Sequence, residues 1–302
     1  MTDETPKRPK WASVLLVVLP LWLVVSGGLA MWYFSGEGAR RDHVEQERFA
    51  QAISAPMLAD DLKKIVEIIG ERNGASENAA KNLTRMASMI EGLLGPSNTG
   101  YTVRREKGPA DWPLIRVTVA GQKPDSPAIW VISSYDSRPG SPGVEANATG
   151  MAATMAAAQA LAGDTPEMNI HFVFLPHAND PDAPILETAT MLKKLAVSPK
   201  AVLCVEAMGA GEELWLSSRD TAAAPLGLVQ GLGSVRGAEV VCLGEDTDPA
   251  SVLFEMGLPA VRVATRPVVL SDESDDKLPS PAVVAASTGR LVELIRRCAG
   301  SR

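Results

Sequence analysis

The sequence predicts an α/β protein: a three-layer sandwich with a central, mostly parallel mixed sheet flanked by helices and preceded by one transmembrane helix. Three observations predict it. Short apolar runs alternate with segments of helical periodicity from residue 101 onward. A Gly/Pro-rich loop joins one of these runs to a helix of small residues. Residues 11–34 form an apolar run without a charge. With 302 residues and 46% hydrophobic content, the chain can build one large domain.

The N-terminal region predicts a membrane anchor. Trp11–Phe34 is longer than the about 20 residues that a span needs, and aromatic residues lie at both ends of it. A cleaved signal peptide is the alternative, but its apolar core has roughly 7–15 residues and an A-x-A site should follow. Basic residues in the tail 1–10 favour an N-terminus inside. We therefore expect a single-pass protein of a bacterial inner membrane, with its C-terminal domain on the periplasmic side.

The next segments predict a stalk and the start of the domain. Residues 35–55 form a charged stalk, which we expect to be a solvated helix or a helix that contacts a partner. The domain then spans residues 56–302. Apolar residues at helical spacing predict amphipathic helices over 61–73 and 76–95. Ser76 or Asn78 is the expected N-cap of the second helix, and Gly95-Pro96 ends it.

The remainder of the domain reads as alternating strands and helices. Strands are predicted at 101–105, 114–120, 128–133, 171–175, 201–206, 214–217, 239–243 and 260–264. Helices are predicted at 149–162, 183–196, 221–232, 249–256 and 281–298. This alternation indicates a sheet with helices on both faces.

Composition excludes some classes of function. The formal net charge of −7 argues against binding to nucleic acid. The three cysteines are too few and too widely spaced for a disulfide framework or a zinc knuckle.

The loop after residue 133 is where an α/β protein would place its chemistry, because it follows the carboxyl end of a strand. No histidine lies in this loop. The side chains it offers are those of Ser134, Asp136, Glu145, Ala146 and Asn147.

Two motifs in this loop resemble the co-catalytic di-zinc aminopeptidases, the family that also holds glutaminyl cyclase and the nicastrin and transferrin-receptor ectodomains. That family reads roughly His-x-Asp and then Gly-Ala-x-Asp-Asn-x-Ser-Gly. Here Ser134-Tyr135-Asp136 and GVEANATG at 143–150 take their places. The resemblance implies that the ligand histidine has become Ser134 and that the metal-bridging carboxylate has become Ala146.

The resemblance extends over about residues 57–297 and implies further losses. The family's Glu-Glu pair, a general base and a ligand, falls near Ala178 and Asn179. Glu206 is the one implied ligand position that keeps a carboxylate, and Ala250 or a neighbour stands where the last ligand histidine would be. A His-Thr loop of the family is replaced by the segment 271–279. Its acidic part, Asp272–Asp276, could bind a cation, but we interpret it as a solvated charge run.

A hydrolytic zinc needs about three protein ligands and an open position for water. A reduced site for one zinc could combine His177, Asp136, Asp180 and Glu206. One histidine with scattered acids shows no convergence in the sequence, so we favour His177 as a loop histidine and expect no cofactor, with zinc as the alternative.

Structural roles compete with functional ones at the same residues. With Ser134 in place of a ligand histidine, Asp136 is expected to make a loop hydrogen bond or cap a helix. Asn147 could cap the helix that starts near Ala148. Glu206 is expected to pair with a lysine or arginine. Ser134 lacks the G-x-S-x-G context of a nucleophile.

The sequence thus leaves three functions open, and the losses argue against an enzyme. The first is a membrane-anchored, catalytically inactive peptidase-like protein that binds a protein or peptide. The second is an active or weak metallo-aminopeptidase with the reduced metal site. The third is a structural subunit of a membrane complex. We expect contact with the membrane through Trp11–Phe34 and no nucleic-acid partner.

Overall fold

The computed structural model describes residues 20, 22, 25–28, 53–179, 185–218, 238–242, 249–266 and 277–300. The chain divides into two compact units, 1–51 and 52–302. Most of the predicted span Trp11–Phe34 and of the stalk lies outside the described residues, as do the helix predicted at 221–232, Asp180 and most of the acidic segment 271–279. Among the helices that are described, none combines the length and the apolar character needed to cross a membrane.

Eight strands of the second unit form one mixed sheet, in the order β1-β2-β4-β3-β5-β8-β6-β7. They are β1 (Arg104–Lys107), β2 (Pro113–Val119), β3 (Ile129–Ser134), β4 (Ile170–Leu175), β5 (Ala201–Val205), β6 (Leu214–Ser218), β7 (Ala238–Cys242) and β8 (Ala260–Ala264). Strand β3 pairs in parallel with β4 and β5, β5 with β8, and β6 with β7. The pairs β1–β2, β2–β4 and β6–β8 are antiparallel.

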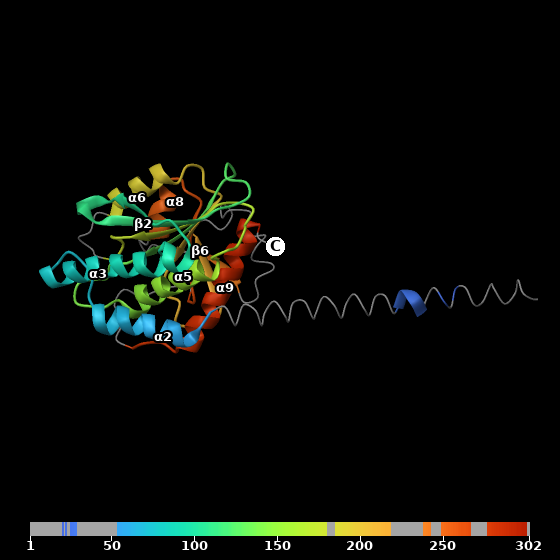
Figure 1. Cartoon of the computed structure of the whole chain (residues 1–302), viewed down its shortest axis with the longest axis horizontal. Coiled ribbons are helices and arrows are strands. Elements are labelled where there is room, and N and C mark those ends of the chain that lie inside the picture. The colour runs from blue at the N-terminus through green and yellow to red at the C-terminus, as the bar shows by residue number, and fades with distance from the viewer. Residues whose placement is uncertain are drawn as a thin grey trace, which may run out of the picture. The chain divides into compact units, whose positions relative to one another are not determined.

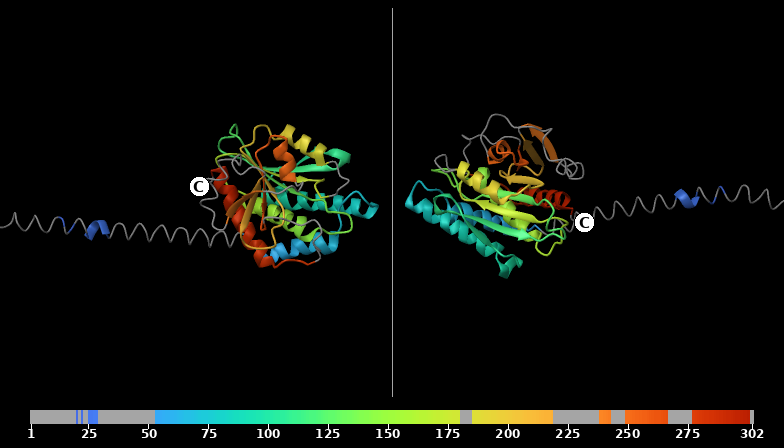
Figure 2. Two further views of the ribbon diagram at one scale, coloured as in Figure 1. Left: turned by 180° about the vertical axis from the view of Figure 1, so that it is seen from behind. Right: turned by 90° about the horizontal axis from the view of Figure 1, so that it is seen from above.

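Helices cover both faces of the sheet (Figure 1). They are α2 (Ala55–Lys63), α3 (Glu77–Leu94), α4 (Pro96–Thr99), α5 (Thr149–Ala160), α6 (Ile185–Leu195), α8 (Pro249–Glu255) and α9 (Pro281–Ala299), with shorter turns η1 (Lys64–Ile69), η2 (Pro109–Asp111) and η3 (Val144–Ala148). Helices α2, α3, α5 and α9 lie on one face and α6 and α8 on the other, and Figure 2 shows α2 beside α9 from behind. The predicted α/β sheet flanked by helices is confirmed.

Each face has its own apolar core. The alternating side chains of β3 divide between the two, with Val131 on the face of α5 and Ile132 on the face of α6 and α8. Both side chains are buried, as expected for a central strand covered on both faces. This burial on two sides is why the strands read as continuous apolar runs in the sequence.

Helix α5 is the central helix of the larger core. Its small residues let it lie close to the strands, and nearly all of its side chains are buried. A Cβ on Gly150, at its start, would lie 2.6–2.7 Å from backbone atoms of Glu206. The start of α5 therefore packs directly against the end of β5. This contact brings the loop that leads into α5 close to Glu206.

Local signals set the ends of the helices well. Ser76 caps α3 by accepting a hydrogen bond from the backbone N–H of Ala79, and the helix ends at Leu94 before Gly95. The helix predicted over 61–73 ends earlier, because Gly70 adopts a left-handed φ of 77°. Residues 71–76 then form a loop on the way to α3.

The first strand starts later than predicted. Residues 101–105 were expected to be extended, but β1 begins at Arg104. The hydroxyl of Tyr101 donates a 2.8 Å hydrogen bond to the carbonyl of Ala158, which ties this segment to α5 instead of to the sheet. Tyr101 is 7% exposed, so the burial of its ring outweighs its preference for a strand.

Candidate functional site: a polar network at the carboxyl ends of the strands

Ser134 is the last residue of β3, one residue beyond the predicted end of that strand. Its Oγ accepts a hydrogen bond from Nδ2 of Asn147 at 2.8 Å and another from Nδ2 of Asn179 at 2.7 Å. Nδ2 of Asn147 also donates to the carbonyl oxygen of Ser134 at 2.8 Å. Three residues from three separate segments thus meet at one hydroxyl group.

Asp136 anchors the Asn179 side of this network. Its Oδ2 accepts the backbone N–H groups of Ala178 and Asn179 at 2.9 and 2.8 Å, and its Oδ1 accepts from Nδ2 of Asn179 at 3.2 Å. The side chain is 0% exposed. The expectation of a loop hydrogen bond for Asp136 is confirmed, and the carboxylate fixes the loop that follows β4.

Asn147 does not cap a helix, so that prediction was wrong. It lies inside the turn η3, and the residue before α5 is Ala148, which makes no side-chain cap. The π-helical turn directs the Asn147 amide back toward Ser134, where it makes side-chain hydrogen bonds. Such turns are frequent at functional sites in proteins.

Arg72 holds the other side of the network. Its guanidinium is 0% exposed and donates to Oδ1 of Asn147 at 2.8 Å and to the carbonyl of Tyr135 at 3.0 Å. It also donates to the carbonyls of Gly70 and Ile65 at 2.6 and 3.3 Å. Burial lowers the pKa of Arg72 to about 10, and the negative charge of Asp136 opposes that shift. The side chain is therefore a buried cation at neutral pH.

Glu206 lies one residue beyond β5 and pairs with Arg262 on β8. Nε of Arg262 donates to Oε2 of Glu206 at 2.8 Å, and the side chains are 3% and 18% exposed, respectively. Arg262 also donates from Nη1 to the carbonyl of Arg266 at 3.2 Å. The expectation that Glu206 pairs with a basic side chain is confirmed. Its charge balances a buried guanidinium.

The other predicted site residues lie around this network or away from it. Glu145 accepts the backbone N–H of Gly209 at 3.2 Å, and His177 is 5% exposed after the end of β4. The backbone of Ala146 belongs to η3. Ala250 is buried in the smaller core with Leu253 and other apolar side chains of α8. A position with these apolar neighbours suits packing, not the binding of a metal.

Sequence reasoning missed both arginines. Arg262 carried a usable signal, because a charged residue within the apolar strand β8 must find a partner when that strand is buried. Arg72 carried none, since it stands in the polar end of the helix predicted over 61–73, where charges are common.

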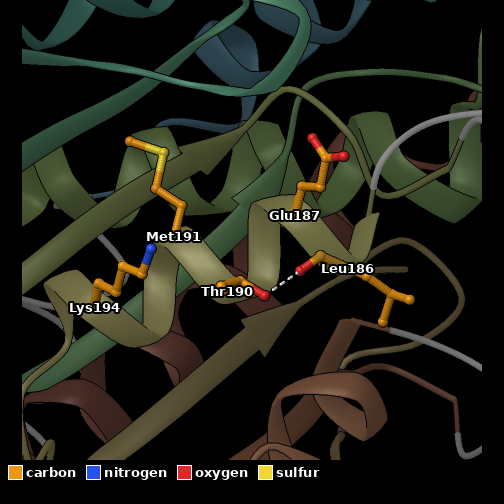
Figure 3. Close-up of a pocket in the computed structure, with 5 residues that line it drawn as sticks. All are labelled: Leu186, Glu187, Thr190, Met191 and Lys194. Carbon is orange, nitrogen blue, oxygen red and sulfur yellow. Dashed lines mark hydrogen bonds between the residues drawn. The ribbon is translucent and has the colours of Figure 1, made fainter.

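Two surface hollows lie apart from the network. One, of about 380 Å³, is lined by a single helix, α6, as Figure 3 shows. There the hydroxyl of Thr190 donates to the carbonyl of Leu186 at 2.7 Å, so it is already bonded within the helix. The other, of about 430 Å³, lies among residues of α2, α3 and α5 and the 4-residue helix α4. Neither hollow is lined by a residue of the network.

One part of the chain matches a known protein family. Residues 115–177, which run from within β2 through β3 and α5 to the loop after β4, match the model of peptidase family M28. The chain has a fold like that of the M28 peptidases. Among curated proteins, none matches the sequence.

Solved structures of aminopeptidases and glutaminyl cyclases resemble the chain over most of its length. The LapA aminopeptidase of Legionella pneumophila is 14% identical with a TM-score of 0.64, covering 86% of this chain and 75% of that one. A glutaminyl cyclase of Porphyromonas gingivalis is 12% identical with a TM-score of 0.59, covering 81% and 98%. A zinc aminopeptidase of Bacillus subtilis is 10% identical with a TM-score of 0.60, covering 80% and 94%. At these identities the likeness concerns the fold.

Where they are described, the side chains at the positions that the resemblance assigns to metal ligands do not form a zinc site. Across the parts of the chain that the structure describes, no group of three or more His, Cys, Asp or Glu side chains is placed to hold a metal ion. This finding is consistent with the loss of ligands inferred from the sequence. Glu206 is engaged by Arg262, and Ser134 is engaged by two amides. Asp180, the fourth member of the reduced site considered above, lies outside the described residues.

Proposed function

We propose that this chain is a membrane-anchored, catalytically inactive protein with the M28 peptidase fold, and that it acts by binding a protein or peptide. One observation carries the proposal. The polar side chains at the carboxyl ends of the strands bond to one another, through Arg72, Asn147, Ser134, Asn179 and Asp136. Such a network supplies rigid hydrogen-bonding groups but neither metal ligands nor a general base.

The ion pair between Glu206 and Arg262 also argues against a zinc site. Zinc binding by Glu206 would withdraw its carboxylate from Arg262, whose side chain is 3% exposed. A buried charge left without its partner costs about 3–5 kcal/mol. Because the fold itself does not imply activity, function has to follow from these side chains. A binding role uses the fold without that cost.

The proposal is tested by capturing partners from detergent-solubilised membranes. The full chain and a chain lacking residues 1–51, which keeps the whole second unit, would each be immobilised, and the captured proteins compared. The proposal expects the same partner on both, since the globular domain makes the contact. A partner retained by the full chain and lost from the shortened chain would overturn it and favour a structural role of the N-terminal region.

The alternative function, an active metallo-aminopeptidase, is tested separately. The full chain, loaded with zinc and desalted, would be analysed for metal by elemental mass spectrometry and assayed with aminopeptidase substrates. The proposal expects zinc well below one equivalent and no turnover. Stoichiometric zinc together with turnover would show that the chain is a working metallo-aminopeptidase.

A further inference from the structure

The Ser134 hydroxyl accepts two hydrogen bonds and donates none within the described residues. A serine hydroxyl has two acceptor lone pairs and one proton to donate. Asn147 and Asn179 both donate to Oγ, at 2.8 and 2.7 Å, so both lone pairs are occupied. The only role left for this hydroxyl is that of a donor.

The orientation of both amides is fixed by charged groups. Arg72 can only donate, so the atom of Asn147 that it contacts must be Oδ1, and Nδ2 then faces Ser134. The carboxylate Oδ1 of Asp136 accepts from Nδ2 of Asn179, and Oδ2 accepts the backbone N–H of the same residue. Neither amide can turn its oxygen toward Ser134 without losing a bond to a charged group.

The proton of Ser134 has no acceptor within hydrogen-bond distance in the part of the chain that the structure describes, where the bonds at Oγ are the two that it accepts. The side chain is partly exposed at the end of β3. A hydroxyl that accepts two hydrogen bonds is polarised and donates more strongly. The network therefore presents one oriented, strengthened donor.

Each of the two buried arginines of the site has a carboxylate that balances its charge. Arg72 is a buried cation in the field of Asp136, and Arg262 pairs with Glu206. A neutral acceptor would add no charge to this balance. An ammonium group would find no lone pair on Ser134, and it would meet the partial positive charges of two amide groups.

We infer that Ser134 donates its hydroxyl proton to a neutral carbonyl oxygen of a bound peptide, and that a free peptide ammonium is rejected at this position. The inference rests on the proposed peptide-binding function. It specifies which group of the peptide is recognised at Ser134: a backbone carbonyl and not a free amino terminus.

The test compares two probes that differ in their amino end. N-acetyl-alanyl-alanine amide has carbonyl oxygens and no charge, whereas alanyl-alanine amide has an ammonium group. Each would be titrated into the full chain in detergent and followed by saturation-transfer NMR. The capped probe is expected to bind more tightly. Ser134→Ala should weaken its binding about three- to tenfold, the range for one neutral hydrogen bond. Ser134→Thr, which keeps the hydroxyl, should bind it as the wild type does.

Ser134→Ala leaves the surrounding network with acceptors. Asn147 still donates to the carbonyl oxygen of residue 134, and Asn179 still donates to Asp136. The variant should therefore fold, and a circular-dichroism melt would check this. Ser88→Ala, at an exposed position of α3, is the matched control and should leave binding unchanged.

The inference would be overturned by equal affinity of the capped probe for wild type and Ser134→Ala, or by tighter binding of the ammonium probe. Absence of binding by the capped probe would also overturn it. Partner capture separates this failure from that of the proposed function. A chain that keeps its partner through residues 52–302 but does not bind the capped probe retains the proposed function and loses only the role of Ser134.

Discussion

Arg262 donates from Nε to Oε2 of Glu206 across 2.8 Å, and the two side chains are 3% and 18% exposed. Glu206 follows the end of β5, and Arg262 lies in the middle of β8, the neighbouring parallel strand. Glu206 stands at the one position where the family resemblance implies a ligand and a carboxylate remains. The pair explains how a carboxylate can persist there without a metal, because the carboxylate now neutralises a buried cation.

Removing one member of this pair should cost more than removing both. Arg262→Leu is expected to lower the free energy of unfolding by about 3 kcal/mol, because it leaves the Glu206 carboxylate without its main partner. The double variant Glu206→Leu/Arg262→Leu should recover most of that loss. Urea denaturation of all four members of the cycle measures the coupling. Losses that simply add would show that the ion pair contributes nothing.

Arg72 should matter for stability although it lies in a loop. Arg72→Lys is expected to lower the free energy of unfolding by about 3 kcal/mol, because one ammonium group cannot reach the four acceptors that the guanidinium serves. Thermal melts monitored by circular dichroism would measure the change. Lys81→Met breaks an exposed ion pair with Glu77 and should change stability by less than about 0.5 kcal/mol. Equal effects of the two substitutions would refute a structural role for the network.

We predict that the folded protein loses stability in mild acid, because the partly buried His171 becomes protonated. It packs on the ring of Trp130 at 4.6 Å, and its Nδ1 lies 2.9 Å from Oγ1 of Thr118. Burial lowers its pKa from 6.5 to about 4, and the charges of Arg116 and Arg104 act in the same direction. The neutral ring is thus favoured in the folded state.

The sign of the effect follows from linkage. The unfolded chain binds the proton first, so the contribution of His171 is complete above pH 6.5 and is lost as the pH falls toward 4. The slope approaches about 1.4 kcal/mol per pH unit within that window. Urea midpoints at several pH values, compared with His171→Gln, would measure it. An identical pH dependence in the variant would remove His171 as the cause.

The fold was predictable because burial on both sides of the sheet leaves a clear mark on the sequence. Strands such as β3 and β5 are nearly uniform apolar runs, and their predicted ranges agree with the structure to within a residue or so. Short edge strands are harder. Strand β1 is polar throughout, so its start depends on the tertiary contact of Tyr101.

The site was predictable in part. The strand ends located the segments around Ser134, Asp136 and Glu206, because chemistry in α/β proteins gathers at the carboxyl ends of strands. The pairing of these segments was not readable, since hydrogen bonds between distant loops leave no periodic pattern. Arg72 shows this most clearly, because it lies 75 residues before Asn147, its hydrogen-bond partner.

Restoring two residues of the family motif should not restore hydrolysis. Ser134→His/Ala146→Asp reintroduces one implied ligand and the implied bridge. The positions near Ala178 and Ala250 would still lack a base and a ligand, and Ala250 is buried among apolar side chains. We expect no turnover of an aminopeptidase substrate such as leucine p-nitroanilide with added zinc. Measurable turnover that disappears with chelator would contradict the assignment of these positions.

Removing metal should leave the stability of the protein unchanged. A ligand that binds only the folded state at about 100 times its Kd stabilises it by about 2.7 kcal/mol. For a domain of 150–250 residues this corresponds to a fall in Tm of roughly 5–10 °C when the ligand is removed. The side chains of the network at Ser134 bond to one another without a metal, so we expect the Tm of the full chain in EDTA to match that in buffer within about 1 °C. A Tm that fell by 5 °C or more in EDTA and recovered with zinc would show a metal that supports the fold. His177→Ala would then be the first variant to examine, because among the described histidines it is His177 that follows the carboxyl end of a strand.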